Sequence, residues 1–270
     1  MAEKTVRLRL DIIVHQRGLA PSREKARAMI MAGEVVVADR VIDKPGTQID
    51  TNAEITIKGK PRFVSRGGEK LAAALHDFQL DVSERICADV GASTGGFTDC
   101  LLQNGAVRVY AIDVGYGQLD YTLRQDARVV VMERTNARYL TQLPEPIGLA
   151  VADASFISLR LLLPAIKGWI TPQSDVITLI KPQFEAGKRD VGKGGVVKDS
   201  AIHARVLEEV LNFAHEQGFA IRGLTTSPIK GPAGNIEFLA WLSWGTLPDA
   251  DTTPNIEALV ATVIANNIHA

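Results

Sequence analysis

The stretch Asp89-Val90-Gly91-Ala92-Ser93-Thr94-Gly95-Gly96-Phe97-Thr98 joins an apolar run at 86–90 directly to the start of a predicted helix. The turn between them consists of small residues, and three of these are glycines. A backbone without Cβ atoms turns tightly and lets a ligand lie against it, while the helix that follows offers free N–H groups. The stretch therefore predicts a strand, a loop that binds a nucleotide-like cofactor, and a helix.

The same residues also satisfy a second pattern. Gly91-Ala92-Ser93-Thr94-Gly95 fits the Gly-x-Ser-x-Gly turn of serine hydrolases, which also lies between a strand and a helix. That class needs a later acid and a histidine, but His203 and His215 both fall within one predicted amphipathic helix. Asp113 instead ends the next apolar run, roughly 20 residues after the loop, where a carboxylate binds the hydroxyls of an adenosine ribose. We therefore favour the cofactor loop over the hydrolase.

Strand and helix patterns alternate from Glu69 to the end of the chain. Alternation of this kind predicts an α/β fold with a doubly wound, mostly parallel Rossmann-like sheet, whose ligand crevice lies at the carboxyl ends of the strands. The predicted strands are 86–90, 107–112, 128–132, 147–152, 174–181, 219–225 and 235–242, and the predicted helices are about 68–78, 95–104, 158–169, 199–217 and 254–267. The last helix has an apolar stripe that we expect to pack on its own sheet domain, which favours a monomer.

The first sixty residues predict a separate small α+β domain. Leu8–Gly18 and Ser22–Gly33 have the pattern of two short helices, with Ser22 as an N-cap. Short β-branched runs follow at 35–37, 41–42 and 55–57 and predict a small sheet. Residues 61–68 are basic and punctuated by Pro and Gly, so they are expected to connect a domain at 1–60 to a larger domain at 69–270.

Charge is distributed unevenly although the formal net charge is only −1. Residues 1–70 hold 14 Lys and Arg against 9 Asp and Glu, while residues 71–270 hold 16 against 22. A basic module fused to an acidic one indicates that the amino-terminal part binds a polyanion. The alternative is that the basic residues form an ordinary solvated surface.

Other classes of protein lack support in the sequence. Cys87 and Cys100 are the only cysteines, and their spacing fits neither a disulfide framework nor a metal site, so no metal is expected. The first residues lack the apolar core of a signal peptide, and no stretch approaches the roughly 18 apolar residues that span a bilayer. We expect a cytoplasmic protein without a membrane partner.

The small domain resembles the RNA-binding module named after ribosomal protein S-four. The residues that carry this resemblance are Leu10-Asp11, Gly18, Ala20, Ser22-Arg23, Ala26, Ile30, Gly33, Val35, Val37 and Lys44-Pro45. It implies binding of structured RNA, with Arg23, Lys25 and Arg27 on the contacting helix, and such cations anchor phosphates without reading sequence. A surface helix with i,i+4 charge pairs is the alternative. Asp39-Arg40 stands where many such modules have Asn-Gly in a hairpin, which leaves the turn type open.

Polar residues end the predicted parallel strands. They are Asp89, Asp113, Glu133, Asp153 and Lys181, with Asn136 just beyond Glu133. Lys181 ends a buried strand pattern immediately before Pro182, and Asp153, at the end of the neighbouring strand, is its natural partner. A lysine that extends from a strand end to the surface is the alternative for a single residue.

The large domain resembles the FtsJ-like ribose 2′-O-methyltransferases, which use S-adenosyl-L-methionine. Their pattern is a Lys before the first strand, an Asp after the fourth, a Lys after the fifth and a Glu near the last. Lys70, Asp153, Lys181 and Glu237 stand at these places, and the resemblance implies that they are catalytic. The implied cofactor-binding residues are Asp89, Gly91, Ser93, Gly95, Gly96, Phe97, Thr98, Asp113, Glu133 and Asn136. Ser93-Thr94 departs from the wider pattern, in which a Pro commonly precedes the glycine pair.

Both domains together resemble the TlyA family, from about residue 5 to 245. Its motifs appear here as 91–98, 113–119 and 133–136. The resemblance implies methylation of ribosomal RNA on cytidine ribose oxygens, with ribosomal RNA or ribosomal subunits as partners. Two alternatives are an RNA-binding or ribosome-assembly factor that keeps the cofactor fold without activity, and the membrane-lytic toxin suggested by the family's older label, hemolysin A.

Residues 187–193 match the first part of the phosphate-binding P-loop pattern, Gly-x-x-x-x-Gly-Lys. Gly194, however, stands where that motif needs Ser or Thr, so a triphosphate site is not expected. Lys188, Arg189 and Lys193 lie among glycines in this segment, which suits a flexible basic flap over bound RNA. A merely disordered loop is the alternative.

Overall fold

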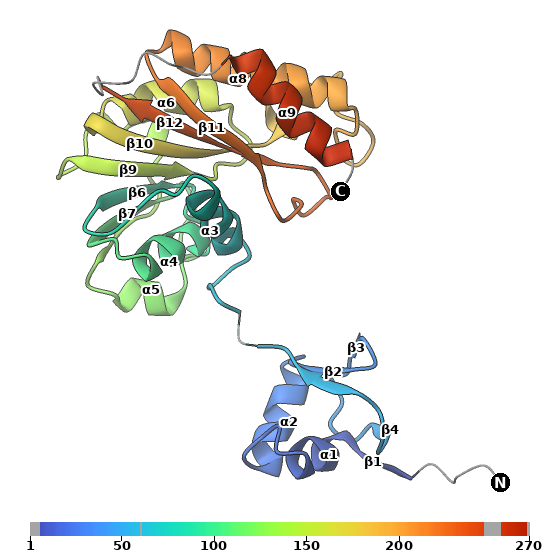
Figure 1. Ribbon diagram of the computed structural model, residues 1–270. Helices are drawn as coiled ribbons and strands as arrows, with labels where there is room; N and C mark the ends of the chain where they lie inside the picture. Colours follow the sequence, from blue (N-terminus) through green and yellow to red (C-terminus); the bar gives the residue numbers. More distant parts are fainter. Residues whose placement is uncertain (1–5, 60, 246–254, 269–270) are drawn as a thin grey trace. The chain divides into compact units, whose positions relative to one another are not determined.

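The structure is a computed structural model that describes residues 6–59, 61–245 and 255–268. It divides into two compact units, Met1–Arg62 and Phe63–Ala270 (Figure 1). Phe63 is 2% exposed and belongs to the core of the second unit. Its ring fills the place that a Cβ on Gly68 would take. Most of the segment expected as a connection, 61–68, therefore packs as part of the larger unit.

The first unit is a small α+β domain. Its elements are β1 (Arg7–Arg9), α1 (Leu10–Gln16), α2 (Arg23–Met31), β2 (Val35–Val37), β3 (Arg40–Val41), β4 (Gln48–Asp50) and β5 (Ile55–Ile57). The Ser22 side chain accepts a hydrogen bond from the Lys25 N–H, so α2 begins at the predicted N-cap. Strand β1 pairs with β4, and neither was predicted, because three-residue strands that pair across 40 residues leave no local pattern.

The β2–β3 hairpin shows which residues form its turn. Val37 pairs with Arg40, so the two-residue loop is Ala38-Asp39 rather than Asp39-Arg40. Both loop residues have positive φ angles, 46° and 63°. That is the backbone of a type I′ turn, the type that Asn-Gly favours, formed here by less permissive residues.

The second unit contains a seven-stranded, doubly wound sheet, which confirms the predicted fold class. Its elements are α3 (Gly67–Asp77), β6 (Ile86–Val90), α4 (Gly96–Gln103), β7 (Arg108–Ile112), α5 (Tyr121–Gln125), β8 (Val129–Met132), the 3₁₀ helix η1 (Ala137–Tyr139), β9 (Ile147–Ala152), α6 (Leu159–Lys167), β10 (Ile170–Ile180), α7 (Pro182–Glu185), α8 (Ser200–Glu216), β11 (Ala220–Thr226), β12 (Phe238–Trp244) and α9 (Ile256–Ile268). The strand order is β11-β12-β10-β9-β6-β7-β8, and among these described strands β12 runs opposite to the other six.

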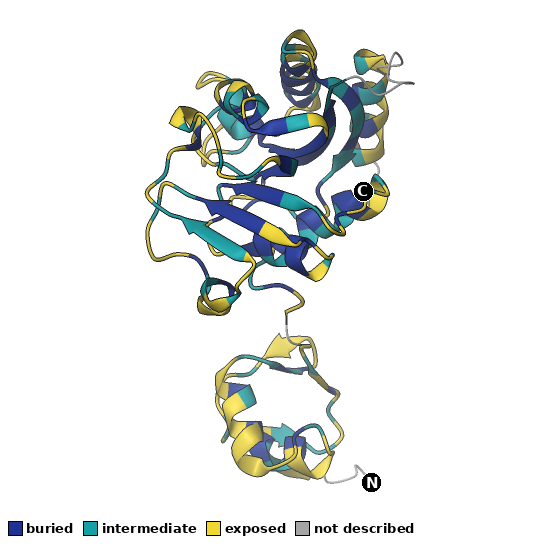
Figure 2. Ribbon diagram, turned by 90° about the vertical axis from the view of Figure 1, so that its left-hand side faces the viewer, coloured by how far each residue is buried: buried dark blue, intermediate teal, exposed yellow. Residues whose placement is uncertain are grey.

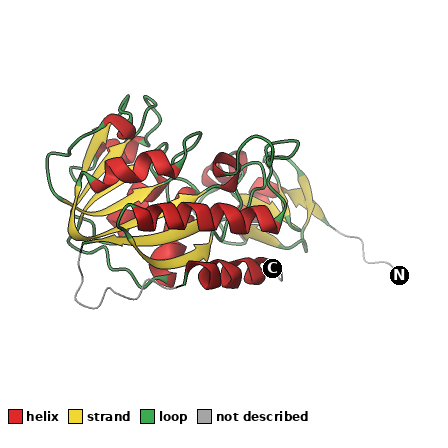
Figure 3. Cartoon of the chain, turned by 90° about the horizontal axis from the view of Figure 1, so that it is seen from above, coloured by secondary structure: helices red, strands yellow, loops and turns green. Residues whose placement is uncertain are grey.

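Helices cover both faces of this sheet. α6, α8 and α9 pack on one face and α3, α4 and α5 on the other, each set with its own apolar core (Figures 1 and 3). The central strands between the two cores are buried along most of their length (Figure 2). Val260 and Val263 of α9 are buried against α8 and β11, so this helix packs on its own chain as expected.

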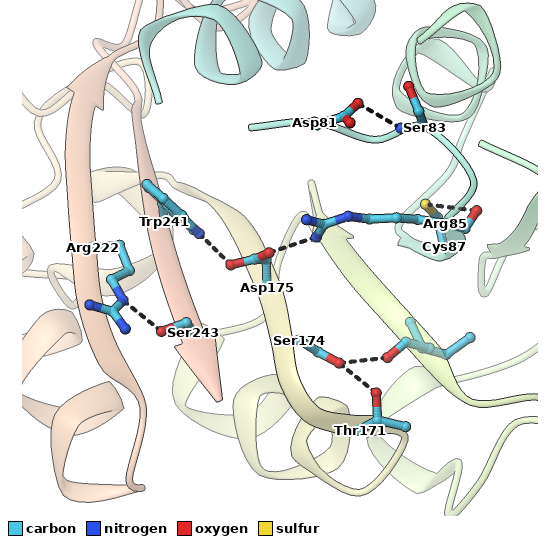
Figure 4. Close-up of polar contacts among 11 residues, drawn as sticks. Asp81, Ser83, Arg85, Cys87, Thr171, Ser174, Asp175, Arg222, Trp241 and Ser243 are labelled. Carbon is cyan, nitrogen blue, oxygen red and sulfur yellow. Dashed lines mark hydrogen bonds and ion pairs between the residues drawn. The ribbon is translucent and has the colours of Figure 1, made fainter. Parts of the chain in front are cut away.

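Polar contacts tie the sheet together toward the amino ends of its parallel strands (Figure 4). The Asp175 carboxylate accepts hydrogen bonds from Arg85 Nη1 at 2.6 Å and from Trp241 Nε1 at 2.7 Å. Arg85 directly precedes β6, Asp175 lies in β10 and Trp241 lies in β12. One carboxylate therefore links three segments of the chain. The opposite edge, where the parallel strands end, is free of this network and carries the cavities described next.

Candidate active site

Two cavities lie side by side at the carboxyl ends of the strands. One has a volume of about 300 Å³ and the other about 720 Å³. Four residues line both of them: Gly91, Ser93, Asp153 and Ser155. The two cavities are therefore neighbours, with these four residues between them.

The smaller cavity holds the four residues of the predicted catalytic set, arranged as two ion pairs. Lys70 Nζ lies 2.5 Å from Glu237 Oε2, and Lys181 Nζ lies 2.6 Å from Asp153 Oδ1. Both lysines are 8% exposed and Glu237 is 1% exposed. Two cations and two carboxylates compensate one another, which a buried site of this kind requires.

Topology explains how these four residues meet. Asp153 and Lys181 follow the neighbouring parallel strands β9 and β10, where Ala152 is in register with Thr178. Glu237 directly precedes β12, whose first residue pairs with the last residue of β10. Lys70 comes from α3, which precedes the whole sheet in sequence. Lys70 and Glu237, which are 167 positions apart in the sequence, thus lie together at the carboxyl edge of the sheet.

The loop after β6 approaches the loop after β9 closely at Gly91. This residue has a φ of +85°, and a Cβ on it would lie 2.7 Å from the Asp153 carbonyl oxygen. Ser93 N–H and Gly115 N–H both donate to the Asp113 carboxylate, at 2.8 and 2.7 Å. Asp113 therefore joins the loops after β6 and β7 at the wall of the larger cavity.

The predicted cofactor residues fall into two groups. Six of them line a cavity: Gly91, Ser93, Gly96, Phe97, Asp113 and Asn136. The other four, Asp89, Gly95, Thr98 and Glu133, lie behind the lining in supporting positions. Gly95 (φ +96°) leaves room for Leu123, whose Cδ1 would be 2.2 Å from a Cβ. Glu133 pairs with Arg124 and accepts from Gly117 N–H at 2.8 Å, which holds the loop after β7.

Asp89 is completely buried beneath the loop. Thr98 Oγ1 donates to its Oδ2 at 2.6 Å, while Oδ1 has no hydrogen-bond partner among the described residues. Burial is the main cause that raises the pKa of this carboxyl to about 7, while the Thr98 hydrogen bond acts in the opposite direction. Asp89 and Thr98 thus fix the junction of β6 and α4 from within.

The larger cavity suits an adenosyl cofactor. Its volume falls within the roughly 300–1,000 Å³ of small-molecule sites, and it combines an apolar wall with a few polar groups. Ile112, Leu161 and Leu162 form part of the apolar wall, and Asp113 and Asn136 contribute the polar groups. Leu161 and Leu162 were missed at the sequence level, because they read simply as the apolar face of a helix.

The hydrolase alternative does not fit the site. Ser93 Oγ contacts Gln118 Oε1 at 3.4 Å, not a histidine. His203 is buried, with Nε2 3.0 Å from the Val197 carbonyl oxygen, and its pKa is lowered by burial. His215 is an exposed residue near the end of α8. Among the described residues, neither candidate histidine is therefore placed as the base that a serine nucleophile needs.

The predicted RNA-binding cations have different surroundings. Arg23 Nε donates to the buried Asp11 at 3.0 Å, beside Arg9, which donates to the same carboxylate. Lys25 and Arg27 on the same helix are exposed. In the second unit Lys188, Arg189 and Lys193 are also exposed. Their segment borders a third cavity of about 490 Å³, which Phe156 and Phe184 line as well.

Comparison with known proteins agrees with this geometry. A family model described as FtsJ-like methyltransferase matches residues 63–244, and an S4 domain model matches residues 8–55. YqxC of Bacillus subtilis is 53% identical over 240 residues, which cover 87% of this chain and 85% of that protein. The 16S/23S rRNA (cytidine-2′-O)-methyltransferase TlyA of Mycobacterium tuberculosis is 49% identical over 242 residues, 87% of this chain and 90% of that protein.

A solved structure of a Streptococcus thermophilus protein, named as a hemolysin, is 45% identical and covers 99% of this chain and all of that one, with a TM-score of 0.73. Within the described ranges, no helix is both long and apolar enough to cross a membrane. The cavity at the carboxyl edge, the paired lysines and carboxylates, and both family matches lead to one assignment. The chain belongs to the FtsJ-like methyltransferases and carries an S4 domain before the methyltransferase domain.

Proposed function

We propose that this protein transfers a methyl group from S-adenosyl-L-methionine to the ribose 2′-hydroxyl of cytidine in ribosomal RNA. The observation that carries the proposal is the position of the two ion pairs, Lys181–Asp153 and Lys70–Glu237, beside the cavity that suits the cofactor. The relative from M. tuberculosis supports cytidine and ribosomal RNA as the substrate class. Because the proposed substrate is ribosomal RNA, we expect the reaction to take place in the cytoplasm.

The main task of the protein in this reaction is to position the ribose 2′-oxygen relative to the methyl group of the cofactor. When bound, S-adenosylmethionine supplies a methyl group activated by the sulfonium charge, and the sulfur keeps the electron pair of the broken carbon–sulfur bond as the oxygen–carbon bond forms. The protein must bring a 2′-oxygen into line with that methyl group and give its proton somewhere to go. A ribose in the smaller cavity would lie next to the residues shared by both cavities, and this adjacency supports the first demand.

The four polar residues divide the remaining work. In its neutral form Lys181 takes the 2′-hydroxyl proton, and as the cation of its ion pair it directs the oxygen lone pair instead. Asp153, 2.6 Å away, keeps the amine in place. Lys70 and Glu237 form the second ion pair in the lining of the same cavity and hold the ribose. Gly91, Ser93, Asp113 and Asn136 hold the cofactor in the larger cavity, while Asp89, Gly95, Thr98 and Glu133 support its walls.

RNA contact completes the proposal. In the S4 domain, Lys25 and Arg27 bind phosphates, and Arg23 joins them from its position on Asp11. Lys188, Arg189 and Lys193 bind phosphates near the site from the segment that borders the third cavity. Exposed cations of this kind supply affinity and orientation rather than sequence choice.

The decisive experiment measures transfer of labelled methyl from S-adenosylmethionine to separated ribosomal subunits and to their deproteinised RNA. Lys181→Ala should abolish incorporation while it leaves cofactor binding measurable. Lys167→Ala is the control, because Lys167 is a partly buried lysine of the same domain that donates to the Gln217 carbonyl at 2.7 Å and lines none of the cavities described above. Cofactor binding by wild-type protein without incorporation into any RNA would instead favour an assembly factor.

A further inference from the structure

Lys181 has a second partner besides Asp153. Its Nζ donates a hydrogen bond to Ser155 Oγ at 2.9 Å. The contact to Asp153 Oδ1 at 2.6 Å is an ion pair, and its geometry does not make a hydrogen bond. The hydroxyl of Ser155 is therefore the group that gives the amine a directional contact.

One directional contact is enough to orient an amine that an ion pair already holds nearby. The Nζ atom of a lysine has three tetrahedral positions beyond its own carbon, which carry three N–H bonds or two and a lone pair. The hydrogen bond to Ser155 fixes one of these directions, and the other two are then determined. With the ion pair to Asp153 alone, the amine is free to rotate about the Cε–Nζ bond, and none of the three directions is defined.

Ser155 lies where the transfer must occur. It lines both the 300 Å³ cavity with the ion pairs and the 720 Å³ cavity that suits the cofactor. A hydroxyl that accepts one hydrogen bond from Lys181 still has its own hydrogen to donate. Ser155 thus contacts the lysine from the side on which the 2′-oxygen and the methyl group must meet.

The backbone around Ser155 is held in one shape. Asp153 N–H donates to the Val90 carbonyl at 2.9 Å. Phe156, the next residue after Ser155, has a φ of +63°, which is strained for a residue with a Cβ. Ser158 Oγ and Leu159 N–H both donate to the Glu185 carboxylate, at 2.7 and 2.8 Å. A strained conformation persists only where its surroundings fix it, and these contacts hold the chain on both sides of Ser155.

We propose that Ser155 is a positioning residue for methyl transfer, which orients the Lys181 amine toward the ribose 2′-oxygen at the junction of the two cavities. This inference rests on the proposed function. The serine acts through Lys181 and is needed for alignment rather than for binding of either substrate.

The test compares Ser155→Ala with Ser155→Thr in the methyl-transfer assay on the best ribosomal substrate. Misplacement of a reacting group by about 1 Å lowers the reaction rate on the order of 100-fold. We therefore expect kcat of Ser155→Ala to fall by roughly 10- to 100-fold. The KM values for S-adenosylmethionine and for the RNA substrate should each stay within about twofold of wild type. Ser155→Thr keeps a hydroxyl at the same position and should recover most of kcat. Ser83→Ala removes an exposed serine at the other edge of the sheet and should behave as wild type.

The outcomes separate the two proposals. A kcat near the wild-type value in Ser155→Ala, or a loss confined to KM, would refute the role of Ser155 while the wild-type activity still supports the proposed function. A low kcat in both variants, with cofactor affinity unchanged by calorimetry, would also refute it, because the hydroxyl would not be the group that matters. Absence of transfer by wild type and by Ser83→Ala would overturn both proposals together.

Discussion

Asp175→Ala should destabilise the methyltransferase domain without impairing its chemistry. The substitution removes the acceptor shared by Arg85 Nη1 and Trp241 Nε1 (Figure 4). An unpaired buried N–H costs about 1–3 kcal/mol, and Trp241 is only partly buried, so we take about 1 kcal/mol for it. The loss of one partner from a buried ion pair costs about 3–5 kcal/mol. The Arg85 side chain is 30% exposed, which lowers that contribution to about 1–2 kcal/mol.

The free energy of unfolding should therefore fall by about 2–3 kcal/mol in total. For a domain of this size, this corresponds to a decrease in Tm of roughly 4–12 °C. Urea unfolding followed by tryptophan fluorescence measures the change in the correct domain, because Trp169, Trp241 and Trp244 all belong to the second unit. The slope of free energy against urea should stay unchanged, since the surface exposed on unfolding is the same.

Asp175→Asn is the control for the two contributions. The amide oxygen still accepts from Trp241, but the charge that holds Arg85 is lost, so the decrease should be about half as large. Methyl transfer per folded molecule should equal that of wild type in both variants, because the cavities lie at the other edge of the sheet. A decrease below about 0.5 kcal/mol for Asp175→Ala, the range of ordinary surface substitutions, would show that the network contributes little and refute the reasoning.

Three further predictions concern the cofactor loop and the S4 domain. Gly91→Ala places a Cβ 2.7 Å from the Asp153 carbonyl oxygen at a φ of +85°, so calorimetry should show cofactor affinity reduced at least tenfold; wild-type affinity would mean that the two loops separate freely. Burial raises the pKa of Asp89 to about 7 from an ordinary 3.8, so the folded protein keeps a proton that the unfolded chain releases. The stability from this group is present below about pH 4 and is lost as pH rises to about 7, so the free energy of unfolding should decrease over this range in wild type. That decrease should be smaller in Asp89→Asn, and identical pH curves would contradict it. Lys25→Ala with Arg27→Ala should weaken RNA binding and reduce the slope of log K against log salt by about 1–2; an unchanged slope would remove these side chains from the interface.

The fold could be predicted from sequence because its signals are local. The apolar run 86–90, the glycine loop and the helix that follows carry the α/β pattern within a few residues, and the alternation repeats it to the end of the chain. Ser22 caps α2 as expected, since capping involves a side chain and an N–H three residues apart. The family resemblance rests on the same local motifs, and both family matches agree with it.

Contacts between distant segments were decided only by the tertiary structure. No local pattern shows that Arg23 donates to Asp11, that Asp89 lies beneath the loop, or that β1 pairs with β4. The role inferred for Ser155 likewise depends on a hydrogen bond to a lysine 26 residues away. Backbone propensity and hydrophobic period act over a few neighbouring residues, whereas burial, pairing and cavity walls depend on which strands become neighbours. The sequence alone therefore determined the class of fold and the chemical types at the strand ends, and tertiary packing determined which of those groups meet.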